Sequence, residues 1–215
     1  MAHRAGNSLA KVEEALTSGV DYLEADVWCY RSRLEVRHEK TAGPLPILWD
    51  RWYVKAGWGP RLSLDAVLAA VVGSGRLFAD LKGSEPDLAS SVAQAVDRAG
   101  AGERVAFSGG WDHLDQLKAL LPQATCFFTV GSLRRLDALR PRLARGDVTA
   151  VAIDSRFLTA EIVVELRDSG VDTVLTWAVE TADEARRLLQ WGVGGITSDS
   201  LPLLVAIREG RIQAG

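Results

Sequence analysis

The chain has 215 residues, of which 47% are hydrophobic and 25% charged, values that are ordinary for a globular protein able to bury a core without disulfide staples. Its net charge of −3, with lysine and arginine scattered along the chain, gives no electrostatic reason to expect a nucleic-acid partner. No apolar run approaches the roughly 18 residues of a membrane span, and no secretory signal is recognisable. We therefore expect a cytoplasmic protein whose two cysteines, Cys29 and Cys126, are buried free thiols, although a secreted protein that had lost its leader would have the same composition.

Short apolar, β-branched runs alternate with amphipathic helical runs along nearly the whole chain. After a first helix at 8–19, this pattern predicts strands at 20–28, 76–82, 104–109, 125–130, 148–154, 172–179 and 194–199, and helices at 63–75, 87–102, 111–121, 132–144, 159–170, 181–192 and 201–210. Strict alternation is typical of parallel strands joined by helical crossovers. These seven strand–helix units become eight when a minimal first strand at the N-terminus is added before the first helix. We expect an α/β fold, a (β/α)8 TIM barrel forming one domain over residues 1–215, with an open doubly wound sheet as the alternative.

One long connection, residues 35–62, interrupts this alternation. It contains three of the seven tryptophans, Trp49, Trp52 and Trp58. Long connections in compact domains are commonly functional or mobile. The aromatic residues would form either a small lid or substrate wall, or a loop that packs on the rim of the barrel.

The predicted strand at 20–28 carries two carboxylates, Glu24 and Asp26, spaced by two residues and therefore on one face. Leu23, Ala25 and Val27 would point to the opposite face, toward the helices. Two neighbouring buried carboxylates repel each other and need compensation from a metal ion, a basic partner or a shared proton. A hard divalent cation is the simplest solution, and an ion-pair network is the common structural alternative.

Further polar residues fall at the same predicted end of the barrel, where the active sites of this architecture lie. Asp80 and Lys82 share a face of the next strand, and His38 follows the return from the preceding one. Trp177 would lie near the end of the strand at 172–179, and Asp199 comes at the end of the last strand. Taken singly, such residues are more often salt bridges, satisfied polar groups or packing, but together they indicate one polar site.

Several motifs of this sequence resemble those of the glycerophosphodiester phosphodiesterases, and the similarity spans essentially the whole chain. The matching stretches are His3-Arg4-Ala5, Asn7-Ser8, Gly19-Val20-Asp21-Tyr22-Leu23-Glu24-Ala25-Asp26-Val27, His38-Glu39, Asp80-Leu81-Lys82, Trp177 and Gly195-Ile196-Thr197-Ser198-Asp199.

The sequence departs from the family's pattern in five respects. Ala5 stands where the family has glycine, and the family's Pro-Glu before Asn7 is missing. Asp80 replaces glutamate, which is one methylene longer. The insertion typical of the family is reduced to the tryptophan-rich connection, and only two residues precede His3, which leaves almost no first strand.

The resemblance implies a (β/α)8 barrel that hydrolyses glycerophosphodiesters to an alcohol and glycerol 3-phosphate. It implies one Mg²⁺ or Ca²⁺ at Glu24, Asp26 and Asp80, phosphate binding by Arg4 and Lys82, substrate contact by Trp177, and general acid–base catalysis by His3 and His38. Which histidine is the base, and whether a substrate hydroxyl or water attacks phosphorus, stay open at this point.

Two other functions are compatible with the same residues. A related enzyme would cleave lysophospholipids or form a cyclic product by phosphate-lyase chemistry, with the tryptophan-rich connection holding an acyl chain. A barrel that has lost turnover would only bind a phosphorylated ligand. The absence of Pro-Glu and the replacement of glutamate by Asp80 favour this alternative. An unrelated phosphate-handling barrel is the remaining alternative.

Overall fold

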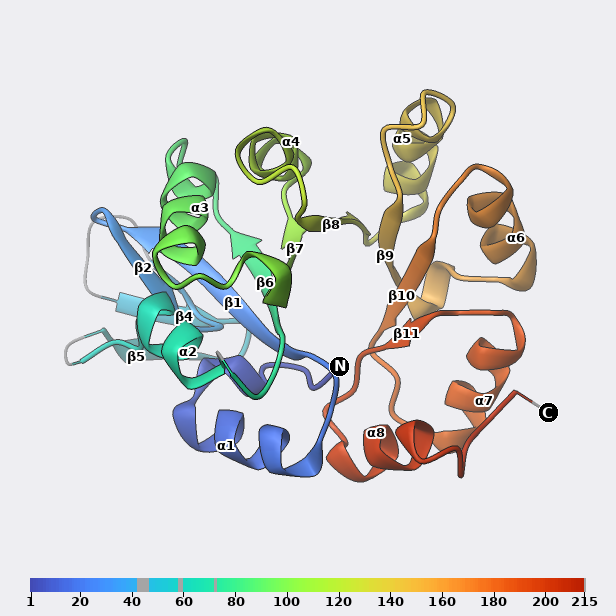
Figure 1. Ribbon diagram of the computed structural model, residues 1–215, viewed down its shortest axis with the longest axis horizontal. Helices are drawn as coiled ribbons and strands as arrows, with labels where there is room; N and C mark the ends of the chain where they lie inside the picture. The colour runs from blue at the N-terminus through green and yellow to red at the C-terminus, as the bar shows by residue number, and fades with distance from the viewer. Residues whose placement is uncertain (42–46, 58–59, 72, 215) are drawn as a thin grey trace.

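The computed structural model describes residues 1–41, 47–57, 60–71 and 73–214, in which strands and helices alternate (Figure 1). The main sheet consists of β1 (Leu23–Tyr30), β2 (Arg33–Val36), β6 (Leu77–Lys82), β7 (Val105–Gly109), β8 (Thr125–Val130), β9 (Ala150–Asp154), β10 (Thr173–Trp177) and β11 (Gly195–Ile196). The helices are α1 (Leu9–Ser18), α2 (Leu64–Val71), α3 (Leu88–Arg98), α4 (Trp111–Leu120), α5 (Leu133–Leu143), α6 (Ala160–Asp168), α7 (Ala182–Gln190) and α8 (Leu201–Arg208). Three 3-10 turns are η1 (Ala5–Asn7), η2 (Gly102–Arg104) and η3 (Ser155–Phe157).

The strands of the main sheet follow the order β11-β10-β9-β8-β7-β6-β1-β2. All neighbouring pairs are parallel except β1 and β2, which form an antiparallel hairpin. This order is the one that successive strand–helix units produce, and it confirms the predicted α/β class and the mainly parallel sheet. Helices α5 to α8 each begin with a side-chain cap: Thr181, for example, accepts a hydrogen bond from the Glu184 amide at 3.2 Å.

The sheet is curled, and the helices cover its outer face (Figure 1). The doubly wound alternative would put helices on both faces, so it does not describe this fold. The predicted first strand is reduced to Ala2, which makes one parallel bridge to Leu23 and another to Ser198. The amide of His3 donates to the carbonyl of Ser198 at 3.0 Å, and the amide of Glu24 donates to that of Ala2 at 2.9 Å. The N-terminal residues thus contact both β1 and the segment that follows β11.

The connection at 35–62 contains more structure than the sequence predicts. Its first residues belong to β2, and a separate antiparallel sheet follows, made of β3 (Lys40–Thr41), β4 (Ile47–Asp50) and β5 (Tyr53–Ala56). The sequence predicts only a long connection here, and these short strands are structure that it does not anticipate. The hairpin between β1 and β2 turns at Arg31 and Ser32, whose φ angles are 50° and 60°. Both lie in the left-handed region that two-residue hairpin turns require.

Two hydrophobic clusters lie on opposite faces of the curled sheet. The larger one packs strands against helices and includes Leu23, Ala25 and Val27, as the alternation along β1 predicts. The smaller one lies on the inner face and consists of Phe78, Ala106, Phe127, Ala150, Ala152 and Leu175. Because side chains alternate along a strand, the residues on β1 and β6 that share the inner face with this cluster include the predicted carboxylates.

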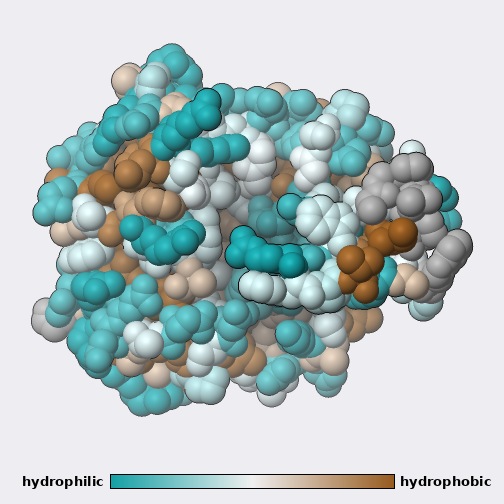
Figure 2. All heavy atoms as spheres, turned by 180° about the vertical axis from the view of Figure 1, so that it is seen from behind, coloured by the Kyte–Doolittle hydropathy of each residue, from teal (hydrophilic) through white to brown (hydrophobic). Residues whose placement is uncertain are grey.

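Cys29 and Cys126 are buried free thiols, as expected. Among the helices that the structure describes, none combines the length and the apolar character needed to cross a membrane. Figure 2 shows a face that is mainly hydrophilic, with hydrophobic residues scattered between the polar ones.

Candidate active site

A cavity of about 350 Å³ opens where the parallel strands end, and it collects the residues that the sequence singles out. Its lining contains all eight residues with a predicted role, which are His3, Arg4, Glu24, Asp26, His38, Asp80, Lys82 and Trp177. They come from the N-terminal segment, β1, the segment after β2, β6 and the end of β10. The curled sheet therefore brings together residues that are far apart in the sequence, such as His3 and Trp177.

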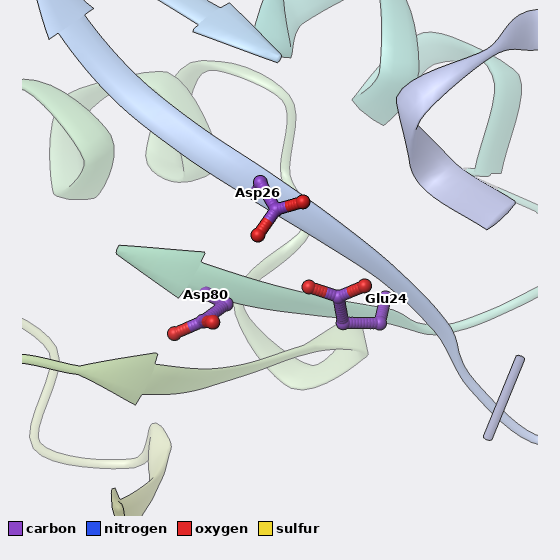
Figure 3. A group of neighbouring side chains, drawn as sticks. All are labelled: Glu24, Asp26 and Asp80. Carbon is purple, nitrogen blue, oxygen red and sulfur yellow. The ribbon is translucent and has the colours of Figure 1, made fainter. Parts of the chain in front are cut away.

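Three carboxylates meet on one side of this cavity. Strands β1 and β6 are parallel neighbours, and their register places Asp26 opposite Asp80. Glu24 precedes Asp26 by two residues and shares its face. One ligand oxygen from each of the three lies within 4.8 Å of the others, and Figure 3 shows the carboxylates turned toward a common space. We call these three residues the acidic triad.

Lys82 supplies positive charge beside the triad. Its Nζ lies 3.0 Å from Oδ1 of Asp26 and also forms an ion pair with Asp80. Burial acts to lower the pKa of Lys82, but the charges of Asp80 and Asp26 outweigh it and raise that pKa. The hydroxyl of Ser108, at the end of β7, donates to Oδ1 of Asp80 at 2.8 Å. Lys82 is therefore charged, and it balances one of the negative charges of the site.

The remaining negative charge is reflected in opposite pKa shifts of the two carboxyls on β1. Burial, together with the charges of Asp26 and Asp80, raises the pKa of Glu24 to about 8. Burial acts to raise the pKa of Asp26 too, but hydrogen bonding with His38 and the charge of Lys82 outweigh it and hold that pKa well below its usual range. The triad thus lacks the positive charge needed to ionise all three groups at neutral pH.

The acidic triad fits a hard divalent cation. Its donors are all carboxylate oxygens, the type that Mg²⁺ and Ca²⁺ prefer. The raised pKa of Glu24 agrees with this fit, because a cation among the three groups would offset both the burial and the repulsion by Asp26 and Asp80 that raise it. Glu24, Asp26 and Asp80 are thus the described residues that would hold such an ion.

The 3-10 turn η1 is pressed against β1 and places two polar residues at the triad. Gly6 permits this approach, since a Cβ at this position would lie 2.6 Å from the Cβ of Ala25. The side chain of Asn7 donates to Oδ2 of Asp26 at 2.8 Å and accepts from the Asp26 amide at 2.9 Å. The amide of Arg4 donates to Oε2 of Glu24 at 2.6 Å.

Arg4 has an unusual conformation for a residue with a side chain. Its φ of 52° and ψ of 15° lie in the left-handed region, which costs free energy for residues other than glycine. Its Nε is buried and has no hydrogen-bond partner among the described residues. A buried donor without an acceptor is rare in folded proteins, so the Nε of Arg4 is available to an acceptor from outside the chain.

His3 lies at the edge of the cavity and is held by both its backbone and its ring. The ring Nδ1 lies 2.9 Å from Oδ1 of Asp199, which follows β11. Burial lowers the pKa of His3, and the charge of Asp199 offsets this only in part. The lowered pKa favours the neutral form of the ring, which can accept a proton.

His38 is enclosed by carboxylates on both sides of its ring. Nδ1 lies 3.3 Å from Oδ2 of Asp26, and Nε2 lies 3.4 Å from Oδ2 of Asp50 at the end of β4. Each ring nitrogen thus faces a carboxylate oxygen that can accept a hydrogen bond.

The aromatic residues divide between the cavity and the surface. Trp177, at the end of β10, lines the cavity and packs against the inner hydrophobic cluster. Trp49 and Trp52 expose 39% and 83% of their surface, and neither lines the cavity. Trp58 lies outside the described residues. Trp49 and Trp52 therefore do not form a wall of this cavity.

The sequence did not predict three residues of the site, which are Asn7, Asp50 and Ser108. Asn7 appeared only as part of a family motif, and its contacts with Asp26 depend on the turn at η1. Asp50 belongs to the small sheet that the sequence did not predict. Ser108 lies near the end of the predicted strand at 104–109, which is the neighbour of the strand that carries Asp80. Because active sites of this architecture form at the strand ends, Ser108 could have been predicted from the sequence.

Comparison with protein-family models and with curated proteins finds no match to this chain. Comparison with solved structures finds similar folds. A phosphodiesterase from Oleispira antarctica, solved in complex with the product sn-glycerol-3-phosphate, matches with a TM-score of 0.76 and 19% identity over 96% of this chain and 95% of its own. A glycerophosphodiester phosphodiesterase from Parabacteroides distasonis matches with a TM-score of 0.76 and 21% identity over 99% and 97% of the two chains.

This chain has the fold of the glycerophosphodiester phosphodiesterases. A third such structure, from Agrobacterium tumefaciens, matches with a TM-score of 0.70 and 20% identity over 97% of this chain and 98% of its own. The chain therefore spans nearly the full length of each of these phosphodiesterases, and the similarity includes the strands that form the cavity.

Proposed function

We propose that this chain is a metal-dependent glycerophosphodiester phosphodiesterase, which hydrolyses a glycerophosphodiester to an alcohol and glycerol 3-phosphate. One observation carries the proposal. Two histidines, two cations and three carboxylates of the family's pattern line a single cavity in a chain that has the fold of these enzymes. The product named for the phosphodiesterase from Oleispira antarctica supports the same substrate class.

Binding of the substrate phosphate is assigned to Arg4 and Lys82. Arg4 has a buried Nε without a partner, and Lys82 is charged and reaches the cavity between two carboxylates. A divalent ion at the acidic triad would add a Lewis acid that neutralises charge on the phosphate oxygens. Trp177 would form an apolar wall against the carbon skeleton of the substrate.

We assign His3 as the general base and His38 as the general acid. The neutral ring of His3 takes a proton from the attacking hydroxyl group as its oxygen forms a bond to phosphorus. As the bond from phosphorus to the alcohol oxygen breaks, His38 donates a proton to that oxygen. The lowered pKa of His3 supports the first role, and the two carboxylates that face His38 support the second. Water as the attacking group gives glycerol 3-phosphate directly, whereas a substrate hydroxyl gives a cyclic phosphate first.

Release of glycerol 3-phosphate from glycerophosphocholine tests this function, with Mg²⁺ or Ca²⁺ added and with a chelator. We expect metal-dependent release, reduced by about 10²–10⁴-fold in H3A and in H38A with no loss of folded structure by circular dichroism. The third histidine, His113, is buried in α4 outside the cavity, and H113Q is the matched control. Near-normal turnover by H3A and H38A would contradict the assigned roles.

The same assay separates the alternatives. Cyclic phosphate from a lysophospholipid, with no glycerol 3-phosphate from glycerophosphodiesters, would identify the lyase. Metal binding without turnover across a panel of diesters would identify a binding protein.

We also infer that the chain forms one closed (β/α)8 barrel over residues 1–215, in which Ala2 takes the place of the first strand. The bridges from Ala2 to Leu23 and Ser198 support this closure. Hydrogen exchange at the His3 and Ser198 amides should be as slow as in β1, and rapid exchange at both would contradict a closed barrel.

A further inference from the structure

A second cavity, of about 560 Å³, adjoins the candidate active site. Arg4 and His38 line both cavities and form the boundary between them. The other walls come from α1, the residues after β2, the inner side of β4 and β5, and the residues before α2. We call this second cavity the side chamber.

The side chamber is lined by an excess of positive charge. Its described lining includes five cations, which are Arg4, Lys11, Arg37, Lys55 and Arg61, and one carboxylate, Glu39. Glu39 forms an ion pair with Lys55. Behind the lining, Glu35 accepts from both Arg37 and Arg61, at 2.9 and 2.7 Å, and so balances one of these two charges. With both carboxylates counted, the chamber keeps three positive charges in excess.

Two of the lining cations, Lys11 and Arg4, have no acidic partner among the described residues, and of these Arg4 lies at the boundary and is also assigned to the substrate phosphate at the triad. Lys11 is exposed on α1 and forms no ion pair there. The guanidinium of Arg4 likewise forms none, and its Nε is buried without an acceptor. Unsatisfied cations that share one cavity provide charge-assisted hydrogen bonds for an anion.

The position of His38 decides which part of the substrate would enter the chamber. The general acid must lie beside the oxygen of the departing alcohol, because it donates the proton to that oxygen. His38 has the acidic triad on one side and borders the side chamber on the other. The alcohol therefore leaves toward the side chamber, and the glycerol phosphate stays with the triad.

We propose that the side chamber binds a second phosphate on the alcohol, so that the preferred substrates are glycerophosphodiesters of a phosphorylated alcohol. This inference rests on the proposed function for its orientation of the substrate. The cations of the chamber would disfavour an alcohol that carries an ammonium group, because like charges repel.

The test compares glycerophosphoinositol with glycerophosphoinositol phosphate, which differ by one phosphate on the alcohol. We expect kcat/KM to be at least about 10-fold higher for the phosphorylated diester, mainly through a lower KM. In K11Q this ratio should fall by about fivefold. Lys118 is exposed on α4, away from both cavities, and K118Q should keep the ratio of the wild type.

A binding measurement without turnover completes the test. Calorimetry should show that inositol monophosphate binds the wild type and K118Q, that K11Q binds it less tightly, and that inositol does not bind. Turnover of both diesters with a ratio near one, and no binding, would overturn the chamber's role and leave the proposed function intact. Lys11-dependent binding without turnover of either diester would support the chamber and reject the proposed function. Neither turnover nor binding would reject both.

Discussion

Asn7 and Asp26 exchange two hydrogen bonds, one in each direction. The Asn7 side chain donates to Oδ2 of Asp26 at 2.8 Å and accepts from the Asp26 backbone amide at 2.9 Å. This contact fixes the N-terminal turn to β1 and orients one carboxylate of the acidic triad. The residues that precede α1 are thus part of the framework of the site.

Replacement of Asn7 by alanine should weaken both the fold and the triad. The Asp26 amide would lose its acceptor in a buried place, and we expect the free energy of unfolding to fall by about 1–3 kcal/mol. Loss of the donor to Oδ2 should weaken Mg²⁺ or Ca²⁺ binding by about 10-fold. Chemical denaturation and calorimetric titration measure the two effects. Q116A, on the exposed side of α4, is the control, and unchanged metal affinity in N7A would refute the orienting role of Asn7.

Replacement of Glu24 by glutamine should stabilise the metal-free protein in a pH-dependent manner. The pKa of Glu24 is raised to about 8, so the folded state resists its ionisation and loses stability as the pH rises from about 4.5 through 8. E24Q removes this loss and keeps an oxygen to accept from the Arg4 amide. We expect a melting temperature a few degrees above the wild type at pH 9 and nearly equal at pH 5.

The same variant tests the metal site by a measurement independent of turnover. Mg²⁺ or Ca²⁺ should raise the melting temperature of the wild type, because a ligand of the folded state stabilises it. E24Q should lose most of this rise. An equal rise in both proteins would show that Glu24 is not a ligand.

Replacement of Lys82 by methionine should destabilise the metal-free protein more than the metal-loaded one. Lys82 forms ion pairs with both Asp26 and Asp80, and its removal takes away the positive charge that these two carboxylates share. We expect a loss of about 2 kcal/mol in the free energy of unfolding without metal, since breaking a buried ion pair is costly. Saturating Mg²⁺ or Ca²⁺ should narrow this loss. K118M is the control. If K82M loses the same free energy of unfolding with and without metal, the metal ion and Lys82 do not neutralise the same carboxylates.

Replacement of Asp199 by asparagine should lower the pKa of His3 further. Burial already lowers this pKa, and the charge and hydrogen bond of Asp199 oppose the shift. In D199N the acidic limb of the pH profile of kcat/KM should therefore move to lower pH, because a base with a lower pKa stays neutral in more acidic solution. NMR titration of the His3 ring measures the same change. D183N, at an exposed position on α7, should leave the profile unchanged, and a shift of the D199N limb to higher pH would contradict the assignment.

The alternation of strands and helices could be predicted because each unit from β6 onward combines an apolar run with an amphipathic helix, and α5 to α8 also begin with a side-chain cap. The hairpin between β1 and β2 could not, because its turn places Arg31 and Ser32 at positive φ without the glycine or asparagine that marks such turns. The strands β3 to β5 are only two to four residues long, too short for a period to be recognised.

The residues of the candidate site also fall into those that the sequence could predict and those that it could not. The spacing of Glu24 and Asp26 predicts a shared face from one strand alone, and the parallel order brings Asp80 opposite Asp26. Asp50 could not be predicted, because its place beside His38 depends on the separate sheet. The single bridging residue Ala2 likewise carries no periodic signal, and its role becomes visible only when Leu23 and Ser198 are seen on either side of it.

The hydrogen bond from the His3 amide to the Ser198 carbonyl has a consequence for the synthesis of the chain. A ribosome delivers Ser198 almost two hundred residues after His3. Until then, the residue that we assign as the general base lacks both its backbone anchor and Asp199. A growing chain, or one cut before Ser198, would carry the acidic triad complete on β1 and β6 and yet have no fixed base, so catalysis would begin only after Ser198 and Asp199 have been made.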